Sequence, residues 1–174
     1  MEKLSKYKIH LTALGEGVHA FEYELGQEFF EAFEHPVVQG AHIHVNLNLD
    51  RKEHMLVLDF TFKGTLHVEC HRCLKEFEME VDLRKALIVK LTGSPEDADD
   101  DSVVLADNTH EFSIAQHMYD FISLSLPIKV VHPLDAKGKS TCDPKAIKQI
   151  EKFMLKEELH NDPRWEILKN INPN

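Results

Sequence analysis

The chain lacks the features that most readily indicate a membrane protein, an exported protein or a nucleotide-dependent enzyme. It has no apolar run near the ~20 residues that a membrane helix needs. Its N-terminal stretch contains lysines, but neither an uninterrupted apolar segment nor a small-residue cleavage site. No Gly-x-x-x-x-Gly-Lys loop, Gly-x-Gly-x-x-Gly turn or Gly-x-Ser-x-Gly elbow occurs. These absences predict a cytoplasmic protein and weaken the case for catalysis.

Cysteine is also scarce, with three in 174 residues. Three cysteines cannot all pair within one chain. Together with the missing export signal, this predicts a reducing compartment, in which the thiols stay free or bind a metal.

Acidic residues dominate the charge, and they are unevenly distributed. The formal net charge is −10. Residues 1–136 hold 12 lysines and arginines against 24 acids, whereas residues 137–174 hold 8 against 6. Nucleic-acid affinity comes mainly from cations that displace counterions, so the acidic body is a poor general phosphate binder. Its charge suits either solubility alone or a basic partner such as a ribosomal protein.

Alternation of apolar and polar residues predicts a series of neighbouring strands. The alternating runs cover residues 21–25, 43–49, 56–62, 66–70 and 77–83, and the last extends to residue 91. Gly64 is expected to end the strand between the third and fourth runs. Residues 103–105 are expected to form one more short strand. Because the turns between the runs are short, we expect an antiparallel meander.

Capping signals predict helices in the second half of the chain. Ser113 is expected to be the N-cap of a helix that ends near Pro127. Its predicted apolar face consists of Ile114, Met118, Phe121 and Ile122.

The tail repeats one helix-start signal. Asp143-Pro144 and Asp162-Pro163 each place a capping acid before a proline at the first helical position. The first pair predicts a helix from about Pro144 to His160. Its inward-facing residues are expected to be Ile147, Ile150 and Met154.

These patterns predict an α+β protein, with an antiparallel β meander or partly open barrel and helices packed on it. We expect an acidic α+β domain over residues 1–142 and a helical C-terminal extension over residues 143–174. The extension would pack on the acidic part or project from it, within one domain overall.

The sharpest local motif is Cys70-His71-Arg72-Cys73-Leu74. Two cysteines separated by two residues can bind one tetrahedral metal, because the turn lets both sulfurs point the same way. Zinc normally takes four ligands. Cys142 is the only other cysteine, and His132 is a weaker fourth candidate beside His67 and His71.

Two interpretations of this motif stay open. One is a zinc site, at most partly occupied because the ligand set is incomplete; the other is free structural thiols. A redox site is disfavoured, because a thioredoxin-like motif opens a helix whereas this one lies between two strand-like runs.

The tail helix is predicted to carry a basic stripe. Lys145, Lys148, Lys152 and Lys156 follow one another at spacings of three or four, so on a helix they share one face. Such a stripe can contact RNA phosphates or a partner, and Arg164 is a further candidate for this role. A solvated face balanced by neighbouring glutamates is the alternative.

Three segments, taken in order, resemble the YceD-like family. The motif at residues 70–74 is similar to the family's Cys-x-Arg-Cys-Leu signature. Residues 121–132, FISLSLPIKVVH, resemble its helix ending in Leu-Pro and followed by a His or Cys region. Asp162-Pro163-Arg164-Trp165, followed by Leu168, resembles its Asp-Pro-Arg-x-x-x-Leu ending.

The resemblance implies a role in the accumulation, synthesis or processing of large-subunit ribosomal RNA. We therefore expect a non-catalytic ribosome-biogenesis factor that binds a ribosomal protein or a large-subunit assembly intermediate, with ribosomal RNA as a further candidate partner and no membrane. The alternative is a metal- or thiol-dependent enzyme that acts on RNA. Many family members carry a second Cys-x-x-Cys segment before the ending, where this chain has only Cys142.

Overall fold

The computed structural model describes residues 2–33, 38–91, 102–106 and 109–154. The strands are β1 (Lys8–His10), β2 (Gly17–Leu25), β3 (Val38–Arg51), β4 (Met55–Glu69), β5 (Glu76–Lys90), β6 (Ser102–Val104) and β7 (Glu111–Ser113). The helices are η1 (Glu2–Tyr7), η2 (Leu11–Ala13), α1 (Gln27–Glu31), α2 (Ala115–Ser125) and α3 (Pro144–Phe153). None of the helices in these ranges has the length and apolar character needed to span a bilayer.

Most of the strands form one open sheet with the order β2-β3-β4-β5-β6. Strands β2 to β5 pair antiparallel with their neighbours in sequence, and β6 pairs parallel with the end of β5. Strands β1 and β7 form a separate antiparallel pair. The predicted α+β meander is confirmed, and it does not close into a barrel.

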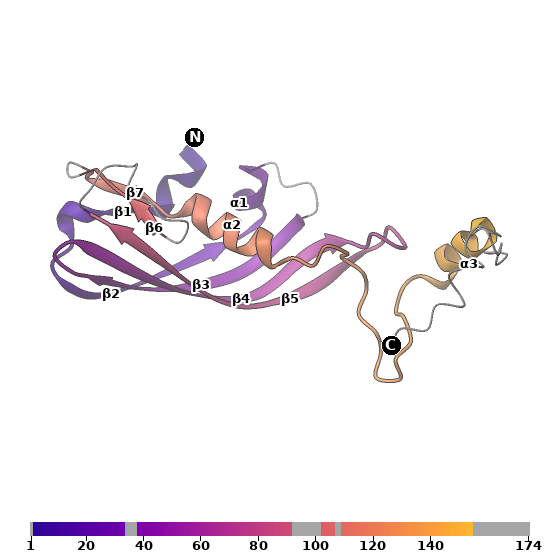
Figure 1. Cartoon of the computed structure of the whole chain (residues 1–174). Helices are drawn as coiled ribbons and strands as arrows, with labels where there is room; N and C mark the ends of the chain where they lie inside the picture. Colours follow the sequence, from indigo (N-terminus) through magenta and orange to yellow (C-terminus); the bar gives the residue numbers. More distant parts are fainter. Residues whose placement is uncertain (1, 34–37, 92–101, 107–108, 155–174) are drawn as a thin grey trace, which may run out of the picture.

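Alternation along the strands buries one face of the sheet. The inward side chains of β3 and β4 are almost fully buried: Ile43, Val45, Leu47, Leu49, Leu56, Leu58, Phe60 and Phe62. Helix α2 lies along this face (Figure 1) and adds Met118 and Ile122 to the same core. Each fully buried large apolar side chain contributes about 1.5–3 kcal/mol, so this face is the main source of stability. The opposite face carries polar residues such as His42 and His44, and none of the helices in the described residues covers it (Figure 1).

Strand β4 runs without interruption through Gly64, so the expectation that this glycine breaks the strand is wrong. Gly64 pairs with Ile43 and has a φ of 154°. A Cβ atom at this position would collide with the backbone oxygen of His42 and lie 2.8 Å from Cα of Ile43. Glycine is required here because two backbones approach closely, not because the strand ends.

The start of α2 also differs from the prediction. Ser113 belongs to β7, where it pairs with Lys8, and α2 begins after Ile114 without a side-chain cap. Ser113 therefore pairs in a strand, although its local sequence predicts a helix N-cap. The predicted apolar face of α2 is confirmed: Ile114, Met118 and Ile122 are buried, and Phe121 is partly buried against the same core.

Helix α3 starts where the Asp-Pro signal predicts. The Asp143 carboxylate accepts a hydrogen bond from the backbone amide of Lys145 at 2.9 Å, as an N-cap does. The inward-facing prediction is wrong for Ile150 and Met154, which are 38% and 65% exposed. The reason is position: α3 stands beyond the tip of the β4–β5 hairpin and not on the sheet (Figure 1). Residues 155–160 of the predicted helix lie outside the described residues.

Candidate metal centre

The turn between β4 and β5 holds Cys70 and Cys73. The backbone amide of Leu74 donates to the carbonyl of Cys70 at 2.9 Å, and the amide of Cys70 donates to the carbonyl of Lys75 at 3.0 Å. Leu74 adopts a φ of 58°, a left-handed conformation that reverses the chain just after the second cysteine. Both cysteines are buried, at 0% and 7% exposure.

The segment after α2 attaches to this turn through its backbone. The amide of His71 donates to the carbonyl of Val130 at 2.8 Å, and Val130 is 2% exposed. The ring of His132 stacks on Phe77 of β5, with 4.5 Å between ring centroids. These contacts fix the position of His132 beside the two cysteines.

A compact turn over residues 133–141 returns the chain to the same place. The Asp135 carboxylate accepts hydrogen bonds from two backbone amides of the turn at 2.8 Å each. The Thr141 hydroxyl donates to the carbonyl of Pro133 at 2.7 Å. Cys142 therefore lies next to His132, although ten residues separate them in sequence.

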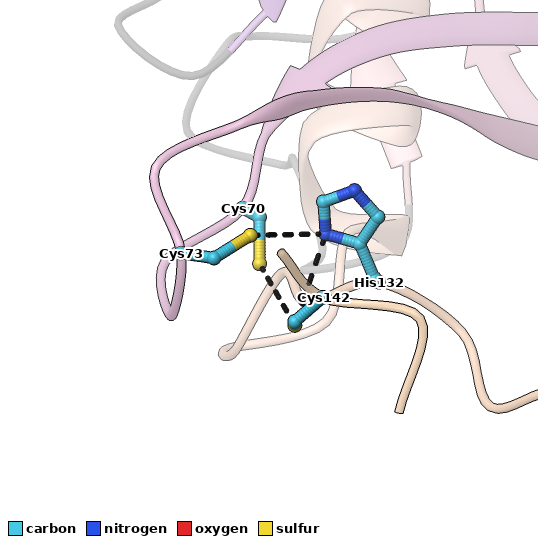
Figure 2. Close-up of side chains that lie close together, drawn as sticks. All are labelled: Cys70, Cys73, His132 and Cys142. Carbon is cyan, nitrogen blue, oxygen red and sulfur yellow. Dashed lines mark hydrogen bonds between the residues drawn. The ribbon is translucent and has the colours of Figure 1, made fainter. Parts of the chain in front are cut away.

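Four potential ligand atoms meet at this point (Figure 2). They are the sulfurs of Cys70, Cys73 and Cys142 and Nδ1 of His132, and all lie within 4.8 Å of one another. Sγ of Cys70 lies 3.8 Å from Sγ of Cys142, and Nδ1 of His132 lies 3.4 Å from Sγ of Cys73 and 3.9 Å from Sγ of Cys142. All four residues predicted as tentative ligands are brought together.

These separations fit a tetrahedral zinc ion. With Zn–S bonds of about 2.3 Å and Zn–N bonds of about 2.0 Å, tetrahedral angles give S···S edges of about 3.8 Å and S···N edges of about 3.5 Å. The three distances given above lie within about 0.4 Å of these edges. The donor set, three sulfurs and one imidazole nitrogen, is also a common structural zinc set.

The pKa values of the neighbouring Cys70 and Cys142 thiols are shifted in opposite directions. Burial alone raises the pKa of Cys70, but hydrogen bonds from the amide of Cys73, the His132 ring and neighbouring amides outweigh it and lower the pKa to about 6. A hydrogen bond with Ser140 lowers the pKa of Cys142, yet burial and the adjacent Cys70 and Cys73 sulfurs outweigh that effect and raise it. Ionisation of Cys70 thus disfavours ionisation of Cys142, and a divalent cation bound between the sulfurs would stabilise both thiolates.

The other candidate residues lie elsewhere. His67 is on β4, with Nε2 at 3.4 Å from Glu78 Oε1, and the side chain of His71 is exposed. Lys145, Lys148 and Lys152 are exposed on α3. Lys156 and Arg164 lie outside the described residues.

Sequence reasoning did not single out two residues that support the cluster. Phe77 stacks on His132, and the hydroxyl of Ser140 accepts a hydrogen bond from the amide of Cys142 at 3.3 Å. Phe77 carried only a strand signal, and Ser140 carried none.

Fold and site together define a β-sheet protein with a Cys3His cluster at the tip of its longest hairpin. The family described as large ribosomal RNA subunit accumulation protein YceD matches residues 58–172. The chain therefore belongs to the YceD family, and the match covers all four residues of the cluster. No curated protein and no solved structure matches the chain. The family description places the protein in the accumulation of large-subunit ribosomal RNA.

Proposed function

We propose that this protein is a non-catalytic ribosome-biogenesis factor, and that a structural zinc ion organises the part of it that binds its partner. The partner is a large-subunit assembly intermediate or one of its ribosomal proteins. The ion would be held by Cys70, Cys73, His132 and Cys142. It would cross-link the tip of the β4–β5 hairpin (residues 70–75) to the C-terminal arm, by which we mean residues 129–153. We expect one zinc per chain, because His132 and Cys142 lie close enough to the two motif sulfurs to serve as the third and fourth ligands.

The observation that carries this proposal is the closed ligand set. Four protein ligands fill a tetrahedral zinc site, whereas a catalytic zinc keeps one position open for water or substrate. The cluster is also buried: its cysteines are at most 7% exposed. Both features favour a structural ion over the alternative, a metal-dependent enzyme that acts on RNA.

The distribution of charge supports RNA contact at the zinc end of the molecule, which consists of the hairpin tip and the C-terminal arm. Residues 129–153 hold six lysines against three acids, although the chain as a whole is strongly acidic. Among the described residues, Lys145, Lys148 and Lys152 have no ion-pair partner and are exposed on α3. Exposed lysines without an ion-pair partner can contact phosphates.

Changing Lys145, Lys148, Lys152 and Lys156 to glutamine should weaken binding to ribosomal RNA or to assembly intermediates and flatten its salt dependence. Each lost phosphate contact lowers the slope of log K against log salt by about 0.7 for single strands. Stability should change by less than about 0.5 kcal/mol, because exposed substitutions seldom do more. The matched control places glutamine at four exposed lysines of residues 1–142, which are Lys6, Lys52, Lys63 and Lys85. Unchanged affinity and slope in the α3 variant would return these lysines to an ordinary solvated surface.

A deletion strain tests the proposed function itself. We expect less large-subunit ribosomal RNA relative to small-subunit RNA, and precursor RNA that accumulates. The wild-type gene should restore the ratio, whereas a gene with Cys142→Ser should not. Normal levels of both RNAs in the deletion strain would contradict the proposal. Nuclease or modification activity in the purified protein would favour the enzyme.

A further inference from the structure

The zinc end of the molecule carries an open apolar groove that the proposed function leaves unassigned. The groove has a volume of about 540 Å³ and lies between the turn at residues 72–74 and one side of α3. Three large apolar side chains around it are mostly exposed: Leu74 at 70%, Phe153 at 85% and Met154 at 65%. The described residues leave these side chains uncovered, which suits a binding surface.

The backbone at Leu74 is held in a costly conformation beside this groove. A φ of 58° is uncommon for residues other than glycine and asparagine. Either of these would form the same turn with less strain. Leucine instead places an apolar side chain on the groove wall at the expense of local stability, and strain of this kind is typical of functional sites.

The side chains of α3 form rows of different chemical character around the helix axis. Lys145, Gln149 and Phe153 stand four residues apart and form one row. The row formed by Lys148 and Lys152 flanks it on one side. On the other side lies the apolar row of Ala146, Ile150 and Met154, which lines the groove. The border of the groove is therefore a cation, an amide and an aromatic ring, with further cations next to it.

The opposite wall adds another cation. Arg72 lines the groove from the turn, and its side chain is exposed. A guanidinium group can stack on a planar ring and donate hydrogen bonds to polar edges. The occupant should therefore combine flat apolar faces, polar edges and negative charge.

We propose that the groove binds unpaired bases of single-stranded RNA. The base faces would stack on Phe153 and contact Leu74, the base edges would meet Arg72 and Gln149, and the adjacent phosphates would meet the lysine rows. Paired bases are excluded because their faces are already stacked in the duplex. This inference rests on the proposed function and specifies the ligand at its zinc end.

The test measures binding of zinc-loaded, full-length protein to a labelled RNA oligonucleotide of about 12 nucleotides, a length typical of single-strand binding sites. The same sequence is tested as a duplex. Phe153→Ala should weaken single-strand binding about tenfold, as loss of one base–aromatic stack does. Phe153→Trp should preserve binding, and Phe153→Leu should behave like alanine because it removes the ring. Leu74→Gly should weaken binding although it relieves the backbone.

Leu124→Ala is the matched control, because Leu124 is 83% exposed on α2, outside the groove lining. Four outcomes would overturn the groove proposal: no RNA binding by the wild type, equal affinity for the duplex, unchanged affinity in Phe153→Ala, or full affinity in Phe153→Leu. If Phe153→Ala instead shifts the emission of Trp165, the only tryptophan, and leaves RNA affinity unchanged, the chain's own C-terminus occupies the groove. The deletion strain separates these failures from a failure of the proposed function, since it measures RNA levels without reference to the groove.

Discussion

His132→Gln should remove zinc from the purified protein and release the C-terminal arm, while the sheet stays folded. Structural zinc binding is worth about 10–16 kcal/mol in apparent free energy, and this substitution removes one of the four side chains that would supply it. The cysteine cluster is separate from the main core around β3, β4 and α2. Hydrogen exchange should therefore rise over residues 129–153 and stay low in β3 and β4.

His71→Gln is the matched control for this prediction. His71 lies within the same motif, but its side chain is exposed and outside the cluster. Its contact with Val130 uses the backbone amide, which the substitution keeps. Zinc content and exchange should match the wild type. Equal zinc loss in the two variants would show that His132 is not the specific ligand.

Gly64→Ala should destabilise the fold by about 3 kcal/mol or more. The new Cβ would meet the backbone of His42 and Ile43, and a φ of 154° is available almost only to glycine. Neither backbone can shift without breaking the β3–β4 pairing that carries the core. Since small domains are stable by only about 5–15 kcal/mol, Gly64→Val should fail to fold. The urea midpoint of unfolding measures the effect.

Gly15→Ala provides the contrast. No atom lies within 4 Å of a Cβ built at Gly15, so the free energy of unfolding should stay within about 1 kcal/mol of the wild type. It can rise, because alanine restricts the unfolded chain. A Gly64→Ala protein as stable as Gly15→Ala would mean that β3 and β4 do not pair in the register seen here.

The strands could be predicted from sequence because burial alternates along them. Residues 43–49 and 56–62 alternate without exception, and each run proved to be half of a longer strand. Gly64 was misinterpreted because glycine marks both strand ends and close backbone contacts, and only the register with Ile43 distinguishes the two. Ser113 was misassigned because its strand partner, Lys8, lies far away in sequence.

The sequence indicated all four candidate ligands, but it could not show that they meet at one point. The Cys-x-x-Cys motif identifies two ligands through local spacing. His132 is one of 12 histidines, and 59 residues separate it from Cys73. Cys142 is the third cysteine, and 72 residues separate it from Cys70. Their approach depends on the Val130 backbone contact and on the turn at residues 133–141, neither of which has a periodic signal.

The exposed side of α3 could not be predicted for a related reason. An amphipathic pattern shows that Ile150 and Met154 share a face but not what covers that face. In the structure the helix lies beyond the hairpin tip, and that face borders the groove.

The central claim is that the four clustered residues hold one zinc ion, and X-ray absorption of the wild-type protein tests it most directly. Protein purified without chelators should contain one zinc per chain, confirmed by elemental analysis. The spectrum should show three sulfurs at about 2.3 Å and one nitrogen at about 2.0 Å from the metal. A folded, full-length protein without zinc whose three thiols react freely would contradict the claim. So would a zinc ion with an oxygen ligand in its coordination shell, because the closed structural site would then be an open one.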